Sequence, residues 1–218
     1  MAQKTVDSPR PARLITVEGG DGSGKSTLLA RIEQFFKDKK ISYILTREPG
    51  GTPVAEEIRE LLLRPRPSGR SMTPLTELML YESARADHVE QVIRPALKSG
   101  NSVLCDRFTH SSLAYQGYAR GLGVELVKRL NDAATQGLSP DIVIWLKLSP
   151  ADARKRMAGR GAKDRLESEA SSFHEAVFSA FDTIAREESS RFIVLDASKS
   201  ADDVFNQLLA HPLWKDFA

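Results

Sequence analysis

The sequence predicts an α/β fold: a three-layer sandwich in which a five-stranded parallel sheet lies between helices. Two observations predict it. Short apolar runs of strand length alternate along the chain with segments whose apolar residues recur at helical spacing, which is typical of a parallel sheet covered by helices. A glycine-rich segment also joins the first apolar run directly to the first helical segment.

The strands are expected at apolar runs. These runs are short and lack the polar alternation of a half-exposed strand, so both faces of the sheet should be covered. The second run along the chain is the weakest of the set. The runs lie at residues 14–17, 42–45, 103–105, 141–146 and 192–195.

Helices are expected between these runs, and the first should cover residues 26–39. Residues 64–70 are too rich in proline and glycine for a helix or a strand, so we expect a surface loop that joins two helices, with a plain connector as its simplest role. Helical spacing recurs at Leu75, Leu78, Met79, Val89, Ile93 and Leu97, and again at Phe173, Val177, Phe181 and Ile184.

The bulk composition fits one domain. At 218 residues and 41% hydrophobic content the chain can bury a substantial core, and we expect a single domain over residues 13–218 behind a flexible tail at residues 1–12. A formal net charge of +2 gives no reason to expect a nucleic acid or a membrane as a partner. The single cysteine, Cys105, suits a reducing compartment, and the chain has neither a long apolar segment nor the apolar core of a signal peptide. The expected location is the cytoplasm.

Residues 19–26, here called the phosphate loop, read GGDGSGKS and fit the pattern G-x-x-x-x-G-K-[ST]. They lie between an expected strand and an expected helix, as the pattern requires. Glycines let successive backbone N–H groups converge on phosphate oxygens, and the helix N-terminus adds a positive partial charge. A chance glycine-rich turn is the alternative, and the Lys25-Ser26 pair weighs against it. The sequence therefore predicts a P-loop NTPase fold.

ATP is the expected nucleotide, because no Asn-Lys-x-Asp guanine motif occurs in the sequence. Lys25 should reach the β and γ phosphates. The residues expected to bind ATP are Gly19, Gly20, Asp21, Gly22, Ser23, Gly24, Lys25, Ser26 and Thr27.

Ser26 and Asp106 are the candidates for holding Mg²⁺. In P-loop enzymes the hydroxyl after the lysine ligates this ion. Asp106 directly follows the apolar run at 103–105, and an α/β sheet places its ligands at the carboxyl ends of its strands. A cap after the strand is the alternative role for Asp106.

Four further segments identify a second substrate through a family resemblance. They read TREPGGT at residues 46–52, DRF at 106–108, SSLAYQG at 111–117 and DRLE at 164–167. In order and spacing they resemble the signature stretches of thymidylate (dTMP) kinases, over residues 13–198. The resemblance implies one nucleoside monophosphate kinase domain, the acceptor dTMP and a homodimer.

Through this resemblance, Arg59 and Arg107 would grip the monophosphate of dTMP, and guanidinium forks match phosphate oxygens. A surface ion pair is the alternative role for Arg59. Tyr81 and Arg85 share one helical face because they are four residues apart. The family uses these positions to stack on thymine and to hydrogen-bond its exocyclic oxygen. Tyr81 stands where phenylalanine is usual in the family, which keeps the ring and adds a hydroxyl.

The resemblance also assigns the base edge and the sugar. Ser112 and Gln116 would contact the thymine edge, while Tyr115 would crowd the sugar C2′ and disfavour a ribonucleotide; ordinary helix surface is the alternative for these three. Asp21 resembles the acidic residue that the family directs at the sugar hydroxyl and the magnesium shell. Glu48 is assigned near the acceptor, although a Glu before Pro-Gly-Gly equally suits a role in stabilising the turn.

A basic segment at residues 154–167 is expected to form a small mobile lid over the triphosphate. A solvated basic face or a patch for an anionic polymer is the alternative. Some members of the family carry a catalytic arginine in the phosphate loop and others in the lid. Because the phosphate loop here has none, the sequence resembles the bacterial-like type with lid arginines. The basic residues of the segment are Arg154, Lys155, Arg156, Arg160, Lys163 and Arg165.

The expected catalytic residues are Lys25, Arg107, Arg156 and Arg160, with Arg165 the next candidate in the lid. A phosphomonoester is mostly dianionic at neutral pH, so no general base is needed and positive charge should carry the catalysis. The predicted reaction is MgATP plus dTMP giving ADP plus dTDP. Another nucleoside monophosphate or deoxynucleoside kinase, or a nucleotide-gated binding protein, is the alternative.

Overall fold

The computed structural model describes residues 11–65, 72–158 and 164–217. Most of the expected tail at residues 1–12, most of the expected loop at 64–70 and the lid residue Arg160 therefore lie outside the described residues. None of the helices in the described ranges combines the length and the apolar composition that a membrane crossing requires.

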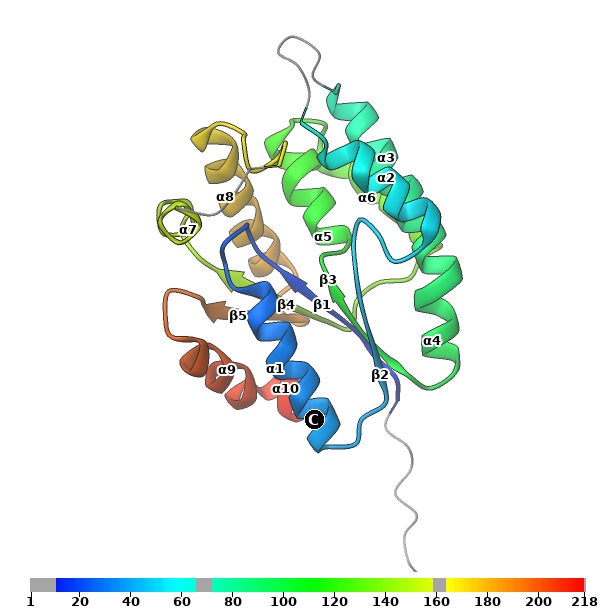
Figure 1. Ribbon diagram of the computed structural model, residues 1–218, viewed down its shortest axis with the longest axis vertical. Coiled ribbons are helices and arrows are strands. Elements are labelled where there is room, and N and C mark those ends of the chain that lie inside the picture. Colours follow the sequence, from blue (N-terminus) through cyan, green and yellow to red (C-terminus); the bar gives the residue numbers. More distant parts are fainter. Residues whose placement is uncertain (1–10, 66–71, 159–163, 218) are drawn as a thin grey trace, which may run out of the picture.

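The sheet has five strands in the order β2-β3-β1-β4-β5, and every neighbouring pair is parallel (Figure 1). This confirms the predicted fold class. Each strand extends beyond its predicted apolar run to a polar residue, and two of these residues, Arg47 and Asp106, pair with each other in register. The strands are β1 (Leu14–Glu18), β2 (Tyr43–Arg47), β3 (Ser102–Asp106), β4 (Ile142–Lys147) and β5 (Phe192–Asp196).

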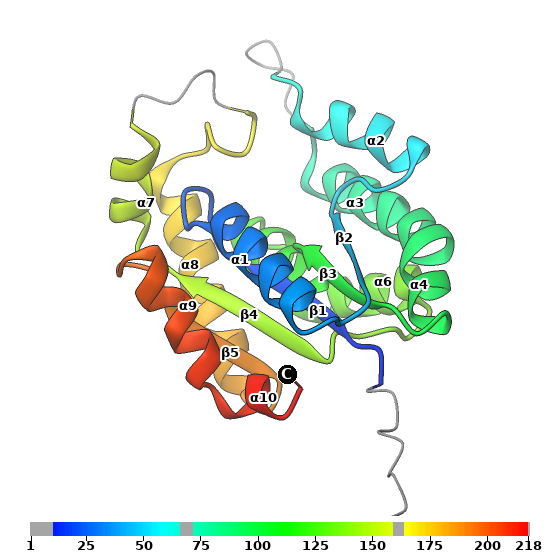
Figure 2. The ribbon, with the colours of Figure 1, turned by 60° about the horizontal axis from the view of Figure 1, so that its bottom comes forward.

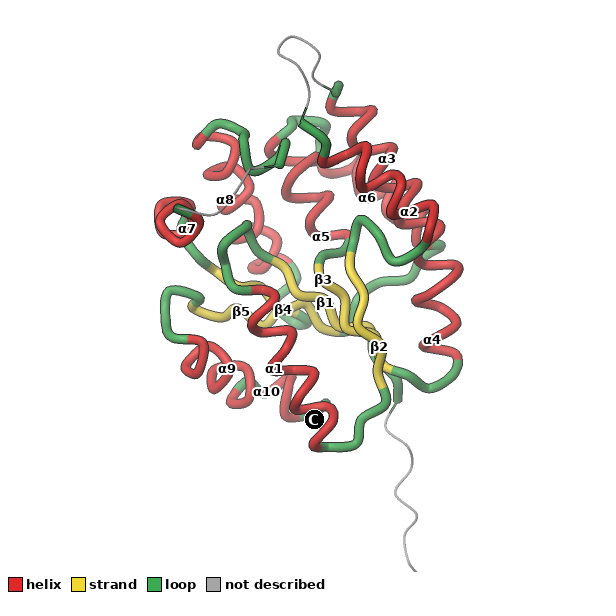
Figure 3. The backbone as a smooth tube through the Cα atoms, in the orientation of Figure 1, coloured by secondary structure: helices red, strands yellow, loops and turns green. Residues whose placement is uncertain are grey.

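Helices cover both faces of the sheet, so the molecule has three layers (Figures 2 and 3). One face is covered by α1 (Lys25–Asp38), α9 (Ala201–Ala210) and α10 (Pro212–Lys215), whose Phe36, Leu208 and Trp214 form one core with the strands. The remaining elements lie over the other face or beyond the carboxyl ends of the strands: α2 (Pro53–Leu63), α3 (Pro74–His88), η1 (Val89–Ile93), α4 (Arg94–Lys98), α5 (Thr109–Ser112), η2 (Leu113–Ala119), α6 (Val124–Thr135), α7 (Pro150–Met157) and α8 (Ser171–Glu187). Here η1 and η2 are π-helical.

Three of these helices begin at the same local signal, a hydroxyl residue followed by proline. Thr52, Thr73 and Ser149 are the N-caps of α2, α3 and α7, and the side-chain oxygen of each accepts a hydrogen bond from a backbone N–H of the first turn. Proline at the next position loses no helical hydrogen bond and has a backbone angle that suits a helix. The starts of α2, α3 and α7 are therefore fixed by local sequence.

The strand order defines where ligands should bind. β1 lies between β3 and β4. After β1 the chain forms β2 and β3 on one side of this strand and then crosses over to form β4 and β5 on its other side. A crevice outside the carboxyl ends of the strands forms at such a switch point. The phosphate loop follows β1 and Asp106 ends β3, so both lie at this crevice.

Candidate active site

The phosphate loop presents free backbone N–H groups at the start of α1. The helix N-cap is Gly24, with a φ of 98°, and it contributes no side-chain cap, nor does the first turn contain an acidic residue. The first N–H groups of a helix have no partner within the helix. They are therefore available to an anion, as the motif predicted.

Close packing against α7 explains one loop glycine. At Gly22 the φ is 77°, and a Cβ atom there would lie 2.9 Å from Met157 Cγ and 3.1 Å from the carbonyl oxygen of Ala153. Any larger residue would push the phosphate loop away from α7. The loop and the first helix of the predicted lid are thus in direct contact.

Lys25 bends back over the loop that precedes it. Its Nζ donates to the carbonyl oxygens of Gly19 (3.1 Å) and Gly20 (3.2 Å) and lies 3.9 Å from Asp21 Oδ1. Burial and repulsion from Arg107 lower the pKa of Lys25 to about 8, against the opposing effect of Asp21, Asp106 and Glu18. The ammonium group is therefore short of negative charge, which a phosphate would supply.

A polar cavity lies over the phosphate loop, and we call it the donor cavity. It is lined by Asp21, Gly22, Gly24, Lys25, Ser26 and Thr27 from the loop, by Asp106 and Arg107 after β3, and by Arg47, Glu48, Arg59, Arg156 and Glu167. Ser26 and Asp106, the predicted magnesium ligands, thus share one cavity. Asp106 Oδ1 is buried and has no hydrogen-bond partner among the described residues. A carboxylate oxygen left in this way beside a serine hydroxyl fits the oxygen ligands that Mg²⁺ takes.

Arg107 holds the phosphate loop to β3. Its φ is 70°, a conformation that costs energy for a residue with a side chain. Its backbone N–H donates to Val17 O, while Nη1 donates to Gly19 O at 2.9 Å and Nη2 to Asp21 Oδ1 at 2.7 Å. The guanidinium group also lies 5.5 Å from the ring centre of Tyr115. One strained residue therefore connects the phosphate loop to the predicted sugar-contacting residue.

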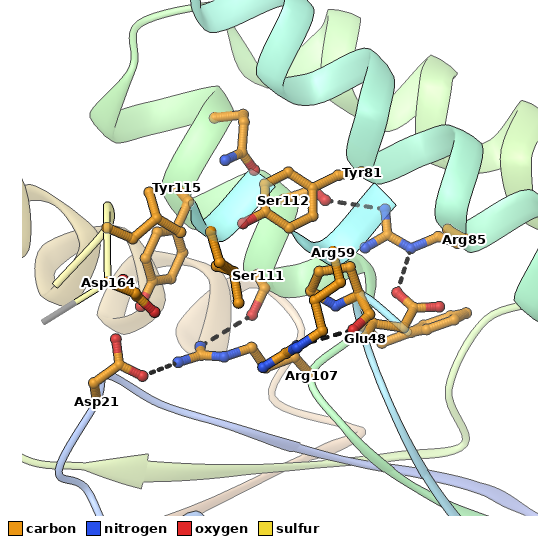
Figure 4. A pocket seen from close by; sticks show the side chains of 15 residues that line it. Asp21, Glu48, Arg59, Tyr81, Arg85, Arg107, Ser111, Ser112, Tyr115 and Asp164 are labelled. Carbon is orange, nitrogen blue, oxygen red and sulfur yellow. Dashed lines mark hydrogen bonds and ion pairs between the residues drawn. The ribbon is translucent and has the colours of Figure 1, made fainter. Parts of the chain in front are cut away.

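Beside the donor cavity lies a second one, here called the acceptor pocket. Figure 4 shows Asp21 and Arg107 at one end of it and Arg85 and Glu48 at the other. Leu63, Asp164 and Leu166, which were not predicted, also line it. Every residue predicted to bind the acceptor lines this pocket: Asp21, Glu48, Arg59, Tyr81, Arg85, Arg107, Ser112, Tyr115 and Gln116. The two cavities adjoin each other, because Asp21, Glu48, Arg59 and Arg107 line both.

Arg85 is held by a buried set of hydrogen bonds. Its Nε donates to Glu48 Oε2 at 2.8 Å, and its Nη1 donates to Glu82, Ser112 and Asn131 at 2.7 to 2.9 Å. Burial alone would lower the pKa of Arg85, but the charges of Glu48 and Glu82 and the hydrogen bonds to them have the larger effect and raise this pKa. Among the described residues no group accepts from Nη2, so this nitrogen is left for a ligand.

Two alternative roles were open from the sequence, stabilisation of the turn by Glu48 and a surface ion pair for Arg59, and the contacts of these residues fit neither. Glu48 binds Arg85 and, through Oε1, lies 3.0 Å from His88 Nδ1. The Gly-Gly turn is instead bound by Glu56, whose Oε1 accepts from Gly51 N at 2.9 Å. Arg59 donates to Pro49 O at 2.9 Å and has no ion-pair partner within the described ranges.

The predicted lid divides into two parts with different contacts. Arg156 on α7 lines the donor cavity and donates to Ala197 O at 2.7 Å. Arg165, in contrast, donates to the buried carboxylate of Glu77 and to Leu62 O. Arg165, the further candidate arginine of the lid, therefore binds residues of α2 and α3 and does not line the donor cavity.

A model of the protein family described as thymidylate kinase matches residues 17–208 of the chain. The chain belongs to the thymidylate kinase family. Its members are phosphotransferases that use ATP to convert dTMP to dTDP, and this chain is one of them. The family and the activity predicted from the sequence are thus confirmed.

Individual thymidylate kinases match almost the whole chain. The enzyme of Bdellovibrio bacteriovorus is 48% identical over 202 residues, which make up 90% of this chain and 94% of that protein. That of an Exiguobacterium species is 45% identical over 199 residues, or 91% and 93% of the two chains. The crystal structure of thymidylate kinase from Ehrlichia chaffeensis superposes with a TM-score of 0.67 at 30% identity, covering 84% of this chain and 92% of that one.

Several polar residues of this thymidylate kinase site escaped the sequence analysis. Glu82 and Asn131 hold Arg85, and Glu77 holds Gln116. Glu77 did carry a signal, since it precedes Tyr81 by four residues and so shares its helical face. A groove that continues from the phosphate loop along α1 was also missed. It is lined by Ser23, Gly24, Thr27, Leu28, Arg31, Leu146, Arg156, Ala197, Lys199, Ala201 and Val204.

Proposed function

We propose that the donor cavity binds the triphosphate of MgATP and the acceptor pocket binds dTMP, with in-line transfer of the γ-phosphoryl group between them. The observation that carries this proposal is the set of residues common to both cavities. Two arginines of that set, Arg59 and Arg107, belong to both, so an acceptor phosphate and a γ-phosphate would meet on the same cations. Alignment and charge neutralisation are the main catalytic demands of phosphoryl transfer.

The acceptor phosphate needs no base, because it is already an anion at neutral pH. Lys25 and Arg107 would hold the two phosphates against their mutual repulsion, and Arg156 and Arg160 would add charge as the lid closes. Support for Arg156 comes from its place in the donor cavity. Arg160 lies outside the described residues, so its role stays a prediction.

Mg²⁺ would be held by Ser26 and Asp106, directly or through water. The unpartnered oxygen of Asp106 in the cavity that Ser26 lines supports this assignment. When bound, the ion supplies positive charge to the phosphates of ATP. The nucleoside part of ATP would then follow the groove along α1, which begins at Ser23 and Gly24 of the phosphate loop.

The base would lie between Tyr81 and the polar residues at the far end of the acceptor pocket. Arg85 Nη2 would donate to the exocyclic oxygen of thymine, and Ser112 and Gln116 would face the base edge. Tyr115 lies against Arg107, next to Asp21, so it would contact the sugar. These contacts would favour a deoxyribonucleotide with a thymine base.

We also propose a homodimer that uses α3. Leu75 and Met79, four residues apart on this helix, are each about half exposed, with 49% and 48% of their surface accessible. Large apolar side chains exposed side by side indicate a surface that a partner covers.

A coupled assay of ADP release tests the function with dTMP, dUMP, UMP, CMP and GMP as acceptors. We expect dTMP to be preferred, with one dTDP formed for each ADP. A preference for any ribonucleotide would remove Tyr115 from its proposed role. ADP release without a phosphorylated acceptor would instead indicate a nucleotide-gated binding protein.

A further inference from the structure

Glu77 binds one end of the side chain that should meet the base. Gln116 lines the acceptor pocket, and its Nε2 donates to Glu77 Oε1 at 2.7 Å. Both side chains are buried, and Glu77 is completely so. Glu77 itself does not line the pocket, so it acts behind Gln116 rather than on a ligand.

The carboxylate of Glu77 is surrounded by hydrogen-bond donors. Arg120 donates to both of its oxygens through Nε and Nη2, at 3.2 and 3.1 Å, and Arg165 donates to Oε2. Burial opposes ionisation, but the hydrogen bonds from Arg120 and Gln116 and the charge of Arg165 outweigh it and hold the pKa of Glu77 below its ordinary value. Glu77 is therefore ionised at neutral pH.

An ionised carboxylate can only accept hydrogen bonds, whereas an amide has one donating end and one accepting end. The end of Gln116 that faces Glu77 must be its NH₂ group. The carbonyl oxygen Oε1, which has no donor among the described residues, is then the end left for the pocket.

We propose that Glu77 is a specificity-determining positioning residue that fixes the amide of Gln116 with its oxygen toward the base. The pocket then presents an acceptor to the base edge. A pyrimidine whose ring nitrogen carries a hydrogen, as in thymine, can donate to it; an aminopyrimidine such as cytosine presents a lone pair at that nitrogen and is rejected. This inference rests on the proposed contact between Gln116 and the base.

The neighbours of Glu77 make the orientation of a substitute predictable. In Glu77→Gln the introduced amide has a single oxygen, and the two arginines compete for it. Oε2 of the carboxylate accepts from both Arg120 and Arg165, so the amide oxygen should take that position and the amide NH₂ should face Gln116. Gln116 would then rotate to accept from it and would expose its own NH₂ to the pocket.

The test compares dTMP with 5-methyl-dCMP, which differ only in the ring nitrogen and the group at C4. We expect Glu77→Gln to lower the ratio of kcat/KM for dTMP to that for 5-methyl-dCMP by about 5- to 150-fold, because a buried donor or acceptor left unpaired costs about 1 to 3 kcal/mol. A general loss of structure would lower both values and leave their ratio unchanged. An unchanged ratio in a folded Glu77→Gln enzyme overturns the proposal.

Glu169→Gln is the matched control. Glu169 also accepts from Arg120 Nη2 but makes no hydrogen bond to Gln116 within the described ranges, so the ratio should stay at the wild-type value. If Glu77→Gln fails to fold, Glu77→Asp can replace it. The shorter side chain keeps a negative charge beside the arginines but withdraws the carboxylate from Gln116. The ratio of kcat/KM for dTMP to that for 5-methyl-dCMP should again fall. A Glu77→Asp enzyme with the wild-type ratio also contradicts the proposal.

Gln116→Ala separates this inference from the function on which it rests. If Gln116→Ala keeps the wild-type ratio, Gln116 does not read the base and the proposed base contact fails. If Gln116→Ala loses the preference while Glu77→Gln and Glu77→Asp keep it, only the role of Glu77 fails. Loss of the preference in all three variants, with Glu169→Gln unchanged, supports both.

Discussion

Lys25 is the residue at which function opposes stability most clearly. Its ammonium group is nearly buried, and its partners in the free protein are mainly the carbonyl oxygens of Gly19 and Gly20. A lysine pKa lowered from 10.5 to about 8 means that the fold holds the charged form at a cost. At about 1.4 kcal/mol for each pKa unit, the cost is on the order of 3 kcal/mol at neutral pH.

We therefore expect Lys25→Met to abolish turnover and to raise the free energy of unfolding by about 1 to 3 kcal/mol at pH 7, allowing for the lost hydrogen bonds. Wild-type protein should regain stability as the pH rises from about 8 to 10.5, because the folded state releases the proton first. The stability advantage of Lys25→Met over the wild-type protein should therefore shrink between about pH 8 and pH 10.5. Urea unfolding at several pH values measures both effects, and a variant less stable than wild type at pH 7 would contradict them.

Arg107 offers a second test at the residue scale, since its backbone is left-handed at a φ of 70°. Both Arg107→Ala and Arg107→Gly should raise the KM for dTMP strongly. Arg107→Gly should be more stable than Arg107→Ala by about 0.5 to 1.5 kcal/mol, because glycine adopts this conformation without strain. Chemical denaturation of the two variants gives the difference. Equal stabilities would show that the surrounding contacts remove the strain.

At the scale of elements, α7 carries neighbouring cations with different surroundings. Both side chains are exposed, but Arg156 lines the donor cavity, whereas Lys155 pairs with Asp152. Arg156→Ala should lower kcat by about 100-fold with a smaller change in ATP affinity, as for other groups that stabilise developing charge. Lys155→Ala is the matched control and should change kcat less than about twofold, because Lys155 forms a solvent-exposed ion pair with Asp152 and does not line the donor cavity. A comparable loss in both would point to the general charge of the helix rather than to Arg156.

The elements that could be predicted from the sequence were those fixed by local pattern. Apolar runs located each strand to within about two residues, and the phosphate loop was recognisable from its glycines and Lys25. Of the residues on one face of α3, Tyr81 and Arg85 were assigned but Glu77 was not. Arg120 and Arg165, which bind Glu77, lie 43 and 88 residues away from it in the chain, so no local pattern joins them to Glu77. The same holds for Asn131, which reaches Arg85 across 46 residues.

At the scale of the whole molecule, the strand order explains why distant segments form one site. The phosphate loop, the end of β2 and the end of β3 meet because β1 and β3 are neighbours and β2 pairs with β3. Sequence alone predicts a parallel sheet but not the order of its strands, since that order depends on which helices pack together. The acceptor residues could be assembled beforehand only through the family resemblance.

The proposed dimer belongs to the same scale. Leu75→Lys combined with Met79→Lys should convert a dimer into a monomer, which sedimentation equilibrium would show as a halving of the mass. Val194→Lys, on the edge strand β5 and 43% exposed, should leave the mass unchanged. A wild-type monomer, or a dimer that survives both changes on α3, would exclude this face as the interface.

The contact between Glu77 and Gln116 also limits how such an enzyme can diverge. A single substitution at Gln116 would leave the buried carboxylate with fewer donors, and a single substitution at Glu77 would release the amide and leave two arginines competing for one oxygen. Either step on its own leaves a buried polar group without its partner, which costs stability. Descendants with another acceptor should therefore have changed both positions together, so the pair is expected to covary where relatives of this chain are aligned.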